Sequence, residues 1–366
     1  MKIPINDLTK QNKILRKKFF NSIKKVFNHS KYILGPEVEA LENKLKSYCG
    51  AKYCVSTSSG TDALLISLMS LGIKRGDEVI TTPFTYVSTA EVILRVGAKP
   101  VFVDIENKTF NIDPKKIKSK INNKTKAIIV VSLFGEPANI RELKKYTLKI
   151  PIIEDAAQSF GSSHYEKKSC NLSLIGCTSF FPTKTLSCYG DGGAIFTSNK
   201  SLYKKIKSIR VHGQTKKYNY KVLGISARLD TLQASFLIEK LKLLDKEIKK
   251  RKEIYKLYKK NFLKVDEIEI FQPKKFNKPN YVIFPMTIKN KKRNKLKAYL
   301  QKKGIQTIIY YPYPLNKFDI FDKKSDVKST PNALSLSKSI ISLPMSPYMS
   351  KKDVNYVINN VMKFFR

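Results

Sequence analysis

The sequence predicts an α/β protein with a mainly parallel central sheet and a smaller α+β domain at its C-terminal end. Runs such as Lys126–Ser132 and Ile150–Glu154 are apolar without alternation, which is typical of strands buried on both faces of a sheet. Segments with helical spacing separate these runs, as expected where helices connect parallel strands. Beyond about residue 235 a long helical pattern replaces this alternation. We therefore expect a large domain over residues 1–244 and a small one over residues 245–366.

The expected elements begin with helices. Residues 1–50 are largely helical, with a break at Tyr32–Glu37 and an amphipathic helix at Glu37–Tyr48. The strands and helices expected next are Lys52–Ser56, Glu78–Thr82, Pro100–Asp104, Lys126–Ser132, Ile150–Glu154 and Ala194–Phe196 as strands, with Thr61–Leu71 and Ser88–Val96 as helices. Further on we expect one long helix over Ala234–Tyr258, strands at Tyr281–Ile288 and Gln306–Tyr311, and helices at Arg293–Lys303 and Lys352–Phe364.

Length and composition exclude several classes of protein. The 366 residues can bury a large core, and the 42% hydrophobic content is ordinary for a globular protein. No run is long enough to span a membrane, and the N-terminus lacks the apolar core of a signal peptide, so we expect a cytoplasmic protein with no membrane partner. The five cysteines are an odd number without metal-ligand spacing, which indicates reduced thiols and no metal site.

The net charge of +41 raises the question of nucleic-acid binding. Lysine far outnumbers arginine, whereas base readout and bidentate phosphate contacts favour arginine. The lysines are also spread along the whole chain instead of forming one stripe. We therefore expect a solvated, lysine-rich surface and no nucleic-acid partner.

A candidate anion site lies in Val55–Leu64, where a strand enters a serine-rich turn and a helix leaves it. The free N–H groups and the dipole of a helix start attract anions. Ser59 is a suitable N-cap, and Gly60 lets a phosphate approach the backbone. The alternative is an ordinary capped helix, since the segment lacks the spacing of a Walker A loop.

A second candidate is the acid at the end of the run Ile152–Asp155. Ligands of α/β folds bind at the carboxyl ends of the strands. A carboxylate there can keep a pyridinium nitrogen protonated, and Gln158 could reach the ring hydroxyl of the same cofactor. The alternative is that Asp155 only caps the following helix.

Lys184 is the candidate nucleophile. Its flanks, Phe180–Thr183 and Thr185–Tyr189, are apolar, aromatic or small, and such surroundings lower the pKa of an amine. Ser179 precedes it by five residues and could bind a phosphate, and Gly190–Gly193 allows a tight turn into the next strand. A surface lysine is the alternative, which the apolar flanks disfavour. Lysine, acid and serine-rich loop together indicate pyridoxal phosphate (PLP) chemistry.

At this point the chain resembles a known family. The segments that carry the resemblance are Ser59–Leu64, Glu154–Gly161, Ser179–Lys184, Gly190–Ala194, His212–Gly213, Ala227–Ala234, Tyr311–Pro312 and Ser342–Met345. They look like the motifs of the DegT-like sugar-nucleotide aminotransferases, which are PLP enzymes of fold type I. The resemblance implies this cofactor site: Lys184 bound to PLP, Asp155 at the pyridine nitrogen, Gln158 at the ring, Tyr86 stacked on it, and Gly60, Thr61 and Ser179 on the phosphate.

The resemblance also implies a homodimer with the active site at its interface. In the family a neighbouring subunit usually lends an Asn to the phosphate, and this chain has Ser226 at that position. A serine can still donate one hydrogen bond, over a shorter reach. Arg228 is the candidate for an acidic group of the substrate, with His212 and Tyr311 nearby. The alternative for Arg228 is an ion pair with Asp230 or another acid.

The implied reaction has two halves. An amino donor, expected to be L-glutamate, leaves its amine on the cofactor, and a nucleotide-linked keto sugar then takes it. Related dehydratases have His in place of Lys184, which favours amino transfer. Several segments look most like enzymes that aminate the 3-oxo form of UDP-N-acetylglucosaminuronic acid for O-antigen synthesis, namely Gln158–Gly161, Lys168–Ser173, Cys177–Pro182 and Tyr311–Lys317. The alternatives are a 3- or 4-keto-6-deoxy dTDP or GDP sugar, or a non-enzymatic regulator that binds PLP or a sugar nucleotide.

Overall fold

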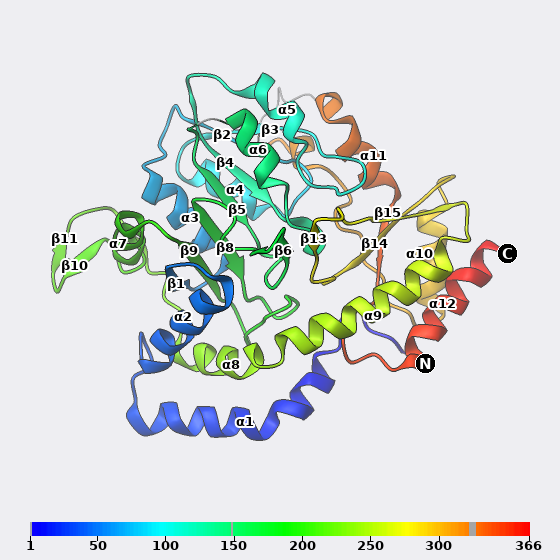
Figure 1. The fold of residues 1–366 in the computed structure, drawn as a ribbon, viewed down its shortest axis with the longest axis horizontal. Coiled ribbons are helices and arrows are strands. Elements are labelled where there is room, and N and C mark those ends of the chain that lie inside the picture. Colours follow the sequence, from blue (N-terminus) through cyan, green and yellow to red (C-terminus); the bar gives the residue numbers. More distant parts are fainter. Residues whose placement is uncertain (1, 148, 322–326) are drawn as a thin grey trace.

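The computed structural model describes residues 2–147, 149–321 and 327–366 (Figure 1). Within these residues, the main sheet has seven strands in the order β1-β9-β8-β5-β4-β2-β3. They are β1 (Tyr53–Thr57), β9 (Gly193–Thr197), β8 (Ile175–Ser179), β5 (Ile152–Asp155), β4 (Thr125–Val131), β2 (Glu78–Thr81) and β3 (Lys99–Phe102). Only β9 runs antiparallel to its two neighbours, so the predicted α/β fold with a mainly parallel sheet is confirmed.

Helices cover both faces of this sheet. They are α3 (Gly60–Leu71), α4 (Ser88–Arg95) and α7 (Lys200–Ile209) over one face, and α5 (Pro114–Ile117) and α6 (Ile140–Thr147) over the other. Neighbouring residues of β4 therefore enter different cores: Ile129 packs with α3 and α4, and Ile128 with α5 and α6. Burial on both sides explains why the strand sequence is a continuous apolar run.

Two helices open the chain, as predicted: α1 (Leu8–His29) and α2 (Pro36–Cys49). The break between them contains Leu34 at a positive φ of 50° and ends at Gly35, the N-cap of α2. A Cβ on Gly35 would lie 2.4 Å from the Lys31 carbonyl oxygen, so the close return of the chain requires glycine there.

The single long helix expected over Ala234–Tyr258 is wrong. The structure has two helices, α8 (Thr231–Leu241) and α9 (Leu244–Phe262), with no glycine or proline between them. The first turn of α9, at Leu244, still shares the core of α8, and only the later turns of α9 enter a second core. Leu237 of α8 packs with α2, whereas Tyr258 of α9 packs with the second sheet.

That second sheet is antiparallel, with the strands β12 (Ile268–Ile270), β14 (Phe284–Ile288) and β15 (Ile340–Leu343). The helices α10 (Arg293–Lys302), α11 (Pro331–Ser339) and α12 (Lys351–Phe365) and the short strands β6 (Ser163–His164), β7 (Lys167–Lys168), β10 (Gln214–Lys216), β11 (Asn219–Tyr220) and β13 (Asn277–Lys278) complete the fold. The core of the second sheet also includes Phe84 and Val131 from the main-sheet part of the chain. The predicted domain boundary, between residues 244 and 245, falls at the first turn of α9.

Two predicted strands of this part differ from the structure. β14 begins only at Phe284, because Tyr281 has a positive φ of 54°, which a strand residue does not adopt. The strand expected over Gln306–Tyr311 is absent from the described structure. Its neighbour Ile305 bridges Ile3 while Ile308 bridges Ser342, so the segment changes partners before a ladder can form.

No helix in the described residues has the length and apolar character needed to cross a membrane. All five cysteines are buried and free, as predicted for reduced thiols.

Candidate active site

A cavity of about 420 Å³ lies where β4, β5 and β8 end, with Val131, Asp155 and Ser179 in its wall. The carboxyl ends of parallel strands are where α/β folds bind ligands. The cavity gathers most of the predicted site residues: Gly60, Thr61, Tyr86, Asp155, Gln158, Ser179, Lys184 and Tyr311. Three predicted residues, His212, Ser226 and Arg228, are not in its wall.

Lys184 lies in a turn that follows β8. Its backbone N–H donates to the Phe181 carbonyl (2.8 Å), and the Phe180 N–H donates to the Gly192 carbonyl (2.7 Å), which ties the turn to the glycine segment before β9. The side chain is half-buried within the cavity wall. Removal from water lowers the pKa of the Lys184 amine, and the Asp155 carboxylate opposes this shift.

Asp155 ends β5 and is almost completely buried. Its carboxylate accepts hydrogen bonds from the Thr89 hydroxyl (2.9 Å) and the Ala157 N–H (3.2 Å). Burial raises the pKa of Asp155, while these hydrogen bonds and the Lys184 charge lower it. Thr89, on the first turn of α4, was not predicted from the sequence, and its contact with Asp155 arises only from the fold.

Gln158 and Tyr311 contact each other although they are far apart in the sequence. The Gln158 amide oxygen accepts from the Phe134 N–H (2.8 Å), and its nitrogen donates to the Tyr311 hydroxyl (3.3 Å). Burial raises the pKa of Tyr311 well above its usual value, so the phenol is neutral. The pair forms a fixed polar edge of the cavity.

The serine-rich turn leads into the start of α3, as expected from the sequence. Ser59 is the N-cap of α3, and its hydroxyl accepts from the Asp62 N–H (3.0 Å). The first N–H groups of the helix, at Gly60 and Thr61, have no partner within the helix and lie at the cavity. A Cβ on Gly60 would lie 2.7 Å from the Ser179 Cβ, so glycine is required for the helix start to pack on β8. Backbone N–H groups and a serine hydroxyl therefore meet at one point.

Tyr86 lies in the loop between β2 and α4 and lines the cavity with a side chain that is 60% exposed. The apolar face of such a ring stays in contact with water unless a flat ligand packs against it.

His212, Ser226 and Arg228 form a separate group on the surface. The Arg228 guanidinium donates to the Ser226 hydroxyl (2.7 Å), and the His212 N–H donates to the Ile225 carbonyl (3.1 Å). This group adjoins the hairpin of β10 and β11, which projects from the body at the left of Figure 1. Among the described residues, Arg228 forms no ion pair with Asp230.

An amine of lowered pKa, an acid at a strand end and the N-terminus of a helix surround one cavity, and this arrangement defines a PLP-dependent enzyme of α/β architecture. The chain belongs to the DegT/DnrJ/EryC1/StrS aminotransferase family, which it matches over residues 13–362. It is 43% identical to the UDP-2-acetamido-2-deoxy-3-oxo-D-glucuronate aminotransferase of Pseudomonas aeruginosa, over 96% of this chain and 97% of that protein. This protein is therefore an enzyme of the sugar aminotransferase class.

Solved structures of aminotransferases have the same fold as this chain. A Brucella abortus aminotransferase of the same family superposes with a TM-score of 0.95 at 35% identity and covers 99% of both chains. Bacillus subtilis NtdA, solved with its bound cofactor PMP, superposes with a TM-score of 0.89 at 28% identity, over 95% of this chain and 81% of that one. The cofactor is PLP, and the cavity suits it because the close approach at Gly60 leaves backbone donors for a phosphate opposite a buried acid.

Proposed function

We propose that this enzyme transfers the amino group of L-glutamate to UDP-2-acetamido-2-deoxy-3-oxo-glucuronate. The observation that supports this substrate is the 43% identity to an aminotransferase named for it, which extends over almost the whole of both chains. The cavity with Lys184 and Asp155 supports the reaction class. Substrate preference depends on a few pocket contacts, so it requires its own test.

In this proposal each cavity residue has a role in the reaction. PLP, when bound, supplies an electron sink for the carbon that loses its proton. Lys184 would hold the cofactor through its amine, and the same amine, when free, would accept the proton from the donor Cα. Asp155, held by Thr89, stabilises a protonated ring nitrogen. Gln158 and Tyr86 orient the ring, and the start of α3 with Ser179 binds the phosphate through Gly60 and Thr61.

We further propose a homodimer in which the partner completes this site. His212, Ser226 and Arg228 lie outside the cavity of their own chain but close to one another. Large exposed apolar side chains surround this region, among them Tyr218 (77% exposed) and Leu223 (84% exposed). Such a surface suits burial against a second copy, which would bring Arg228 and Ser226 to the other cavity.

A cytoplasmic location and a role in O-antigen synthesis are part of the same proposal. The reaction gives a 3-amino uronic acid still linked to its nucleotide, which is the activated form that polysaccharide assembly consumes. We also propose that the chain divides into a large domain over residues 1–244 and a small one over residues 245–366.

A panel of nucleotide-linked keto sugars tests the substrate. The enzyme is incubated with PLP, L-glutamate and one sugar at a time, and 2-oxoglutarate and the amino sugar are measured. We expect the UDP-linked 3-oxo uronic acid to have the highest kcat/KM. Faster turnover of a 3- or 4-keto-6-deoxy dTDP or GDP sugar would assign the enzyme to that substrate class instead. The Lys184→Ala variant is the blank for each reaction.

A further inference from the structure

A buried arginine outside the predicted site lines the same cavity. Arg251 lies on α9, its side chain is only 6% exposed, and it forms part of the cavity wall together with Asn6. Nearby wall residues such as Ile283 and Met345 are apolar. A guanidinium in such a place loses most of its hydration, which is costly unless partners replace the water.

The partners of Arg251 within the protein are incomplete. Its Nη2 lies 3.7 Å from the Glu247 carboxylate, and its buried Nη1 has no hydrogen-bond partner among the described residues. Glu247 is shared with two further donors, because its Oε1 accepts from the Gln11 amide (2.9 Å) and from the Tyr348 hydroxyl. The carboxylate is thus well satisfied, whereas the guanidinium retains an unused donor.

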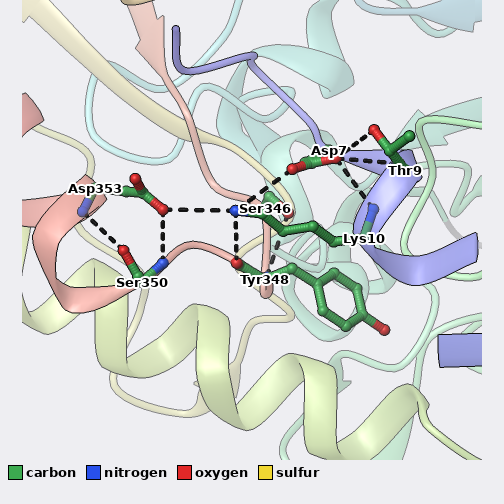
Figure 2. Close-up of polar contacts among 7 residues, drawn as sticks. All are labelled: Asp7, Thr9, Lys10, Ser346, Tyr348, Ser350 and Asp353. Atoms are coloured by element: carbon green, nitrogen blue, oxygen red, sulfur yellow. Dashed lines mark hydrogen bonds and ion pairs between the residues drawn. The ribbon is translucent and has the colours of Figure 1, made fainter. Parts of the chain in front are cut away.

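The segments that carry these residues are held firmly in place. Lys10, at the start of α1, lies 3.6 Å from both Asp7 and Asp353 and donates to the Tyr348 carbonyl (3.4 Å), as Figure 2 shows. Asp353 also forms a capping box with Ser350 at the start of α12. The Tyr348 ring points away from this network in Figure 2. Its hydroxyl donates to the carboxylate of Glu247 on α9. Arg251 therefore belongs to a buried, hydrogen-bonded wall and is not a surface charge.

A substrate carboxylate would complete this arrangement. Charge-assisted hydrogen bonds from arginine to a planar carboxylate are short and strong, and the fork of N–H groups matches two oxygens. A neutral sugar hydroxyl could accept from the free Nη1 donor, but it would form no charge-assisted, two-oxygen contact. Burial lowers the pKa of Arg251, an effect that a bound anion would reverse.

We propose that Arg251 recognises a carboxylate of a substrate in the cavity. The carboxylate has two sources: the amino donor, which any amino acid supplies, and the uronic acid of the sugar, which rests on the proposed function. Each enters the same cavity in its own half-reaction, so the two sources can be separated by experiment.

The experiment measures both half-reactions of the PLP-loaded Arg251→Gln enzyme in single turnovers. One arm uses L-glutamate, and the other runs in reverse with the UDP-linked 3-amino uronic acid; both follow the cofactor absorbance. Loss of a hydrogen bond to a charged group predicts an apparent Kd raised about 10- to 100-fold in at least one arm. A rise with glutamate alone assigns the donor carboxylate, a rise with the sugar alone assigns the uronate, and a rise in both assigns both.

Controls separate recognition from a structural role. Lys252→Gln removes one exposed positive charge from the same turn of α9 and should leave both arms unchanged. UDP binding, which involves no carboxylate, should also be unchanged in Arg251→Gln. Unchanged affinity in both arms, or an equal loss of UDP binding, overturns the proposal.

Two further outcomes are distinguishable. If Arg251→Gln does not fold, Arg251→Lys keeps the charge but loses the fork, and we expect a rise in Kd of roughly 3- to 10-fold; no rise would overturn the proposal. If the wild-type enzyme fails with the uronic acid sugar, the proposed substrate is wrong, while the glutamate arm still tests Arg251.

Discussion

At the scale of single residues, the proposed chemistry depends on the carboxylate of the buried Asp155. Burial raises the pKa of this carboxylate. Hydrogen bonds from Thr89 and Ala157 and the charge of Lys184 lower it. We expect Asp155→Asn to lower the rate of the glutamate half-reaction by at least about 100-fold, in the range found when one preorganised electrostatic contact at a reacting group is removed. Stopped-flow absorbance measures it.

Thr89→Val is the matched comparison, because it removes one hydrogen bond to Asp155 and retains the carboxylate. Its loss should be smaller, about 10-fold. A rate for Asp155→Asn within threefold of wild type would show that this carboxylate has no part in the reaction.

The close contact of Gly60 with Ser179 gives a second prediction. Gly60→Ala places a Cβ 2.7 Å from the Ser179 Cβ, so the apo-protein should lose about 1–3 kcal/mol of stability. The double variant Gly60→Ala/Ser179→Gly removes the clashing carbon and should regain most of that loss. Thermal unfolding without cofactor measures both. Equal stability of the two variants would contradict the close packing of Gly60 against Ser179.

The sequence was sufficient to predict those site residues whose surroundings come from neighbouring residues in the chain. Lys184, Asp155 and the start of α3 each lie in a local motif, so their chemistry is visible without the fold. Thr89 and Arg251 could not be predicted, because each acts through a contact with a distant segment. Arg251 also lies in a helix full of lysines, where a further basic residue carries no signal.

At the scale of secondary-structure elements, buried strands were predictable and helix boundaries were less so. The apolar runs of β4 and β5 reflect burial on both faces, which is a local property of the sequence. No glycine or proline marks the break between α8 and α9, and the first turn of α9 still packs in the core of α8. β8 was not predicted as a strand, since its five residues are few and include Gly176, a weak strand former.

Strand β5 also carries a pH-dependent contribution to stability. Glu154 is fully buried, and burial raises its pKa from 4.5 to about 7. Between these values the unfolded chain releases the proton while the folded chain keeps it, so the free energy of unfolding falls as the pH rises. The contribution is fully present below pH 4.5 and lost above about pH 7.

Glu154→Gln should remove this dependence. The stability of the variant relative to wild type should improve by about 2–3 kcal/mol between pH 5 and pH 8. Chemical unfolding at several pH values, with cofactor removed, measures it. A difference between the two proteins that stays constant over this range would mean that Glu154 is ionised in the fold.

At the scale of the whole molecule, the N-terminal segment packs against the C-terminal part of the chain beside the active site. The Ile3 N–H donates to the Gly304 carbonyl (2.8 Å), and Lys10 bridges to Asp353 of α12. Figure 1 shows the N-terminus beside α9 and α12. The segment between Ile3 and Asp7 thereby closes the cavity wall next to Arg251.

The proposed homodimer makes a quantitative prediction at this scale. Lys184→Ala and Arg228→Ala should each be inactive as homodimers. If each site takes Lys184 from one subunit and Arg228 from the other, random mixing by co-expression restores roughly a quarter of wild-type activity, since half of the dimers carry one intact site. No recovery in a mixture shown to contain heterodimers would place both residues in the same chain's site.

The identity of the cofactor lysine is the claim from which the rest follows, and this chain offers many competitors. Lys240 is the strongest of them, because burial lowers its pKa to about 8. Reduction of the PLP-loaded enzyme with borohydride fixes the cofactor to its lysine, and peptide mapping by mass spectrometry then locates the label. We expect a single phosphopyridoxyl group on Lys184. A label on Lys240 or on any other lysine, with Lys184 unmodified, would contradict the assignment of the active site.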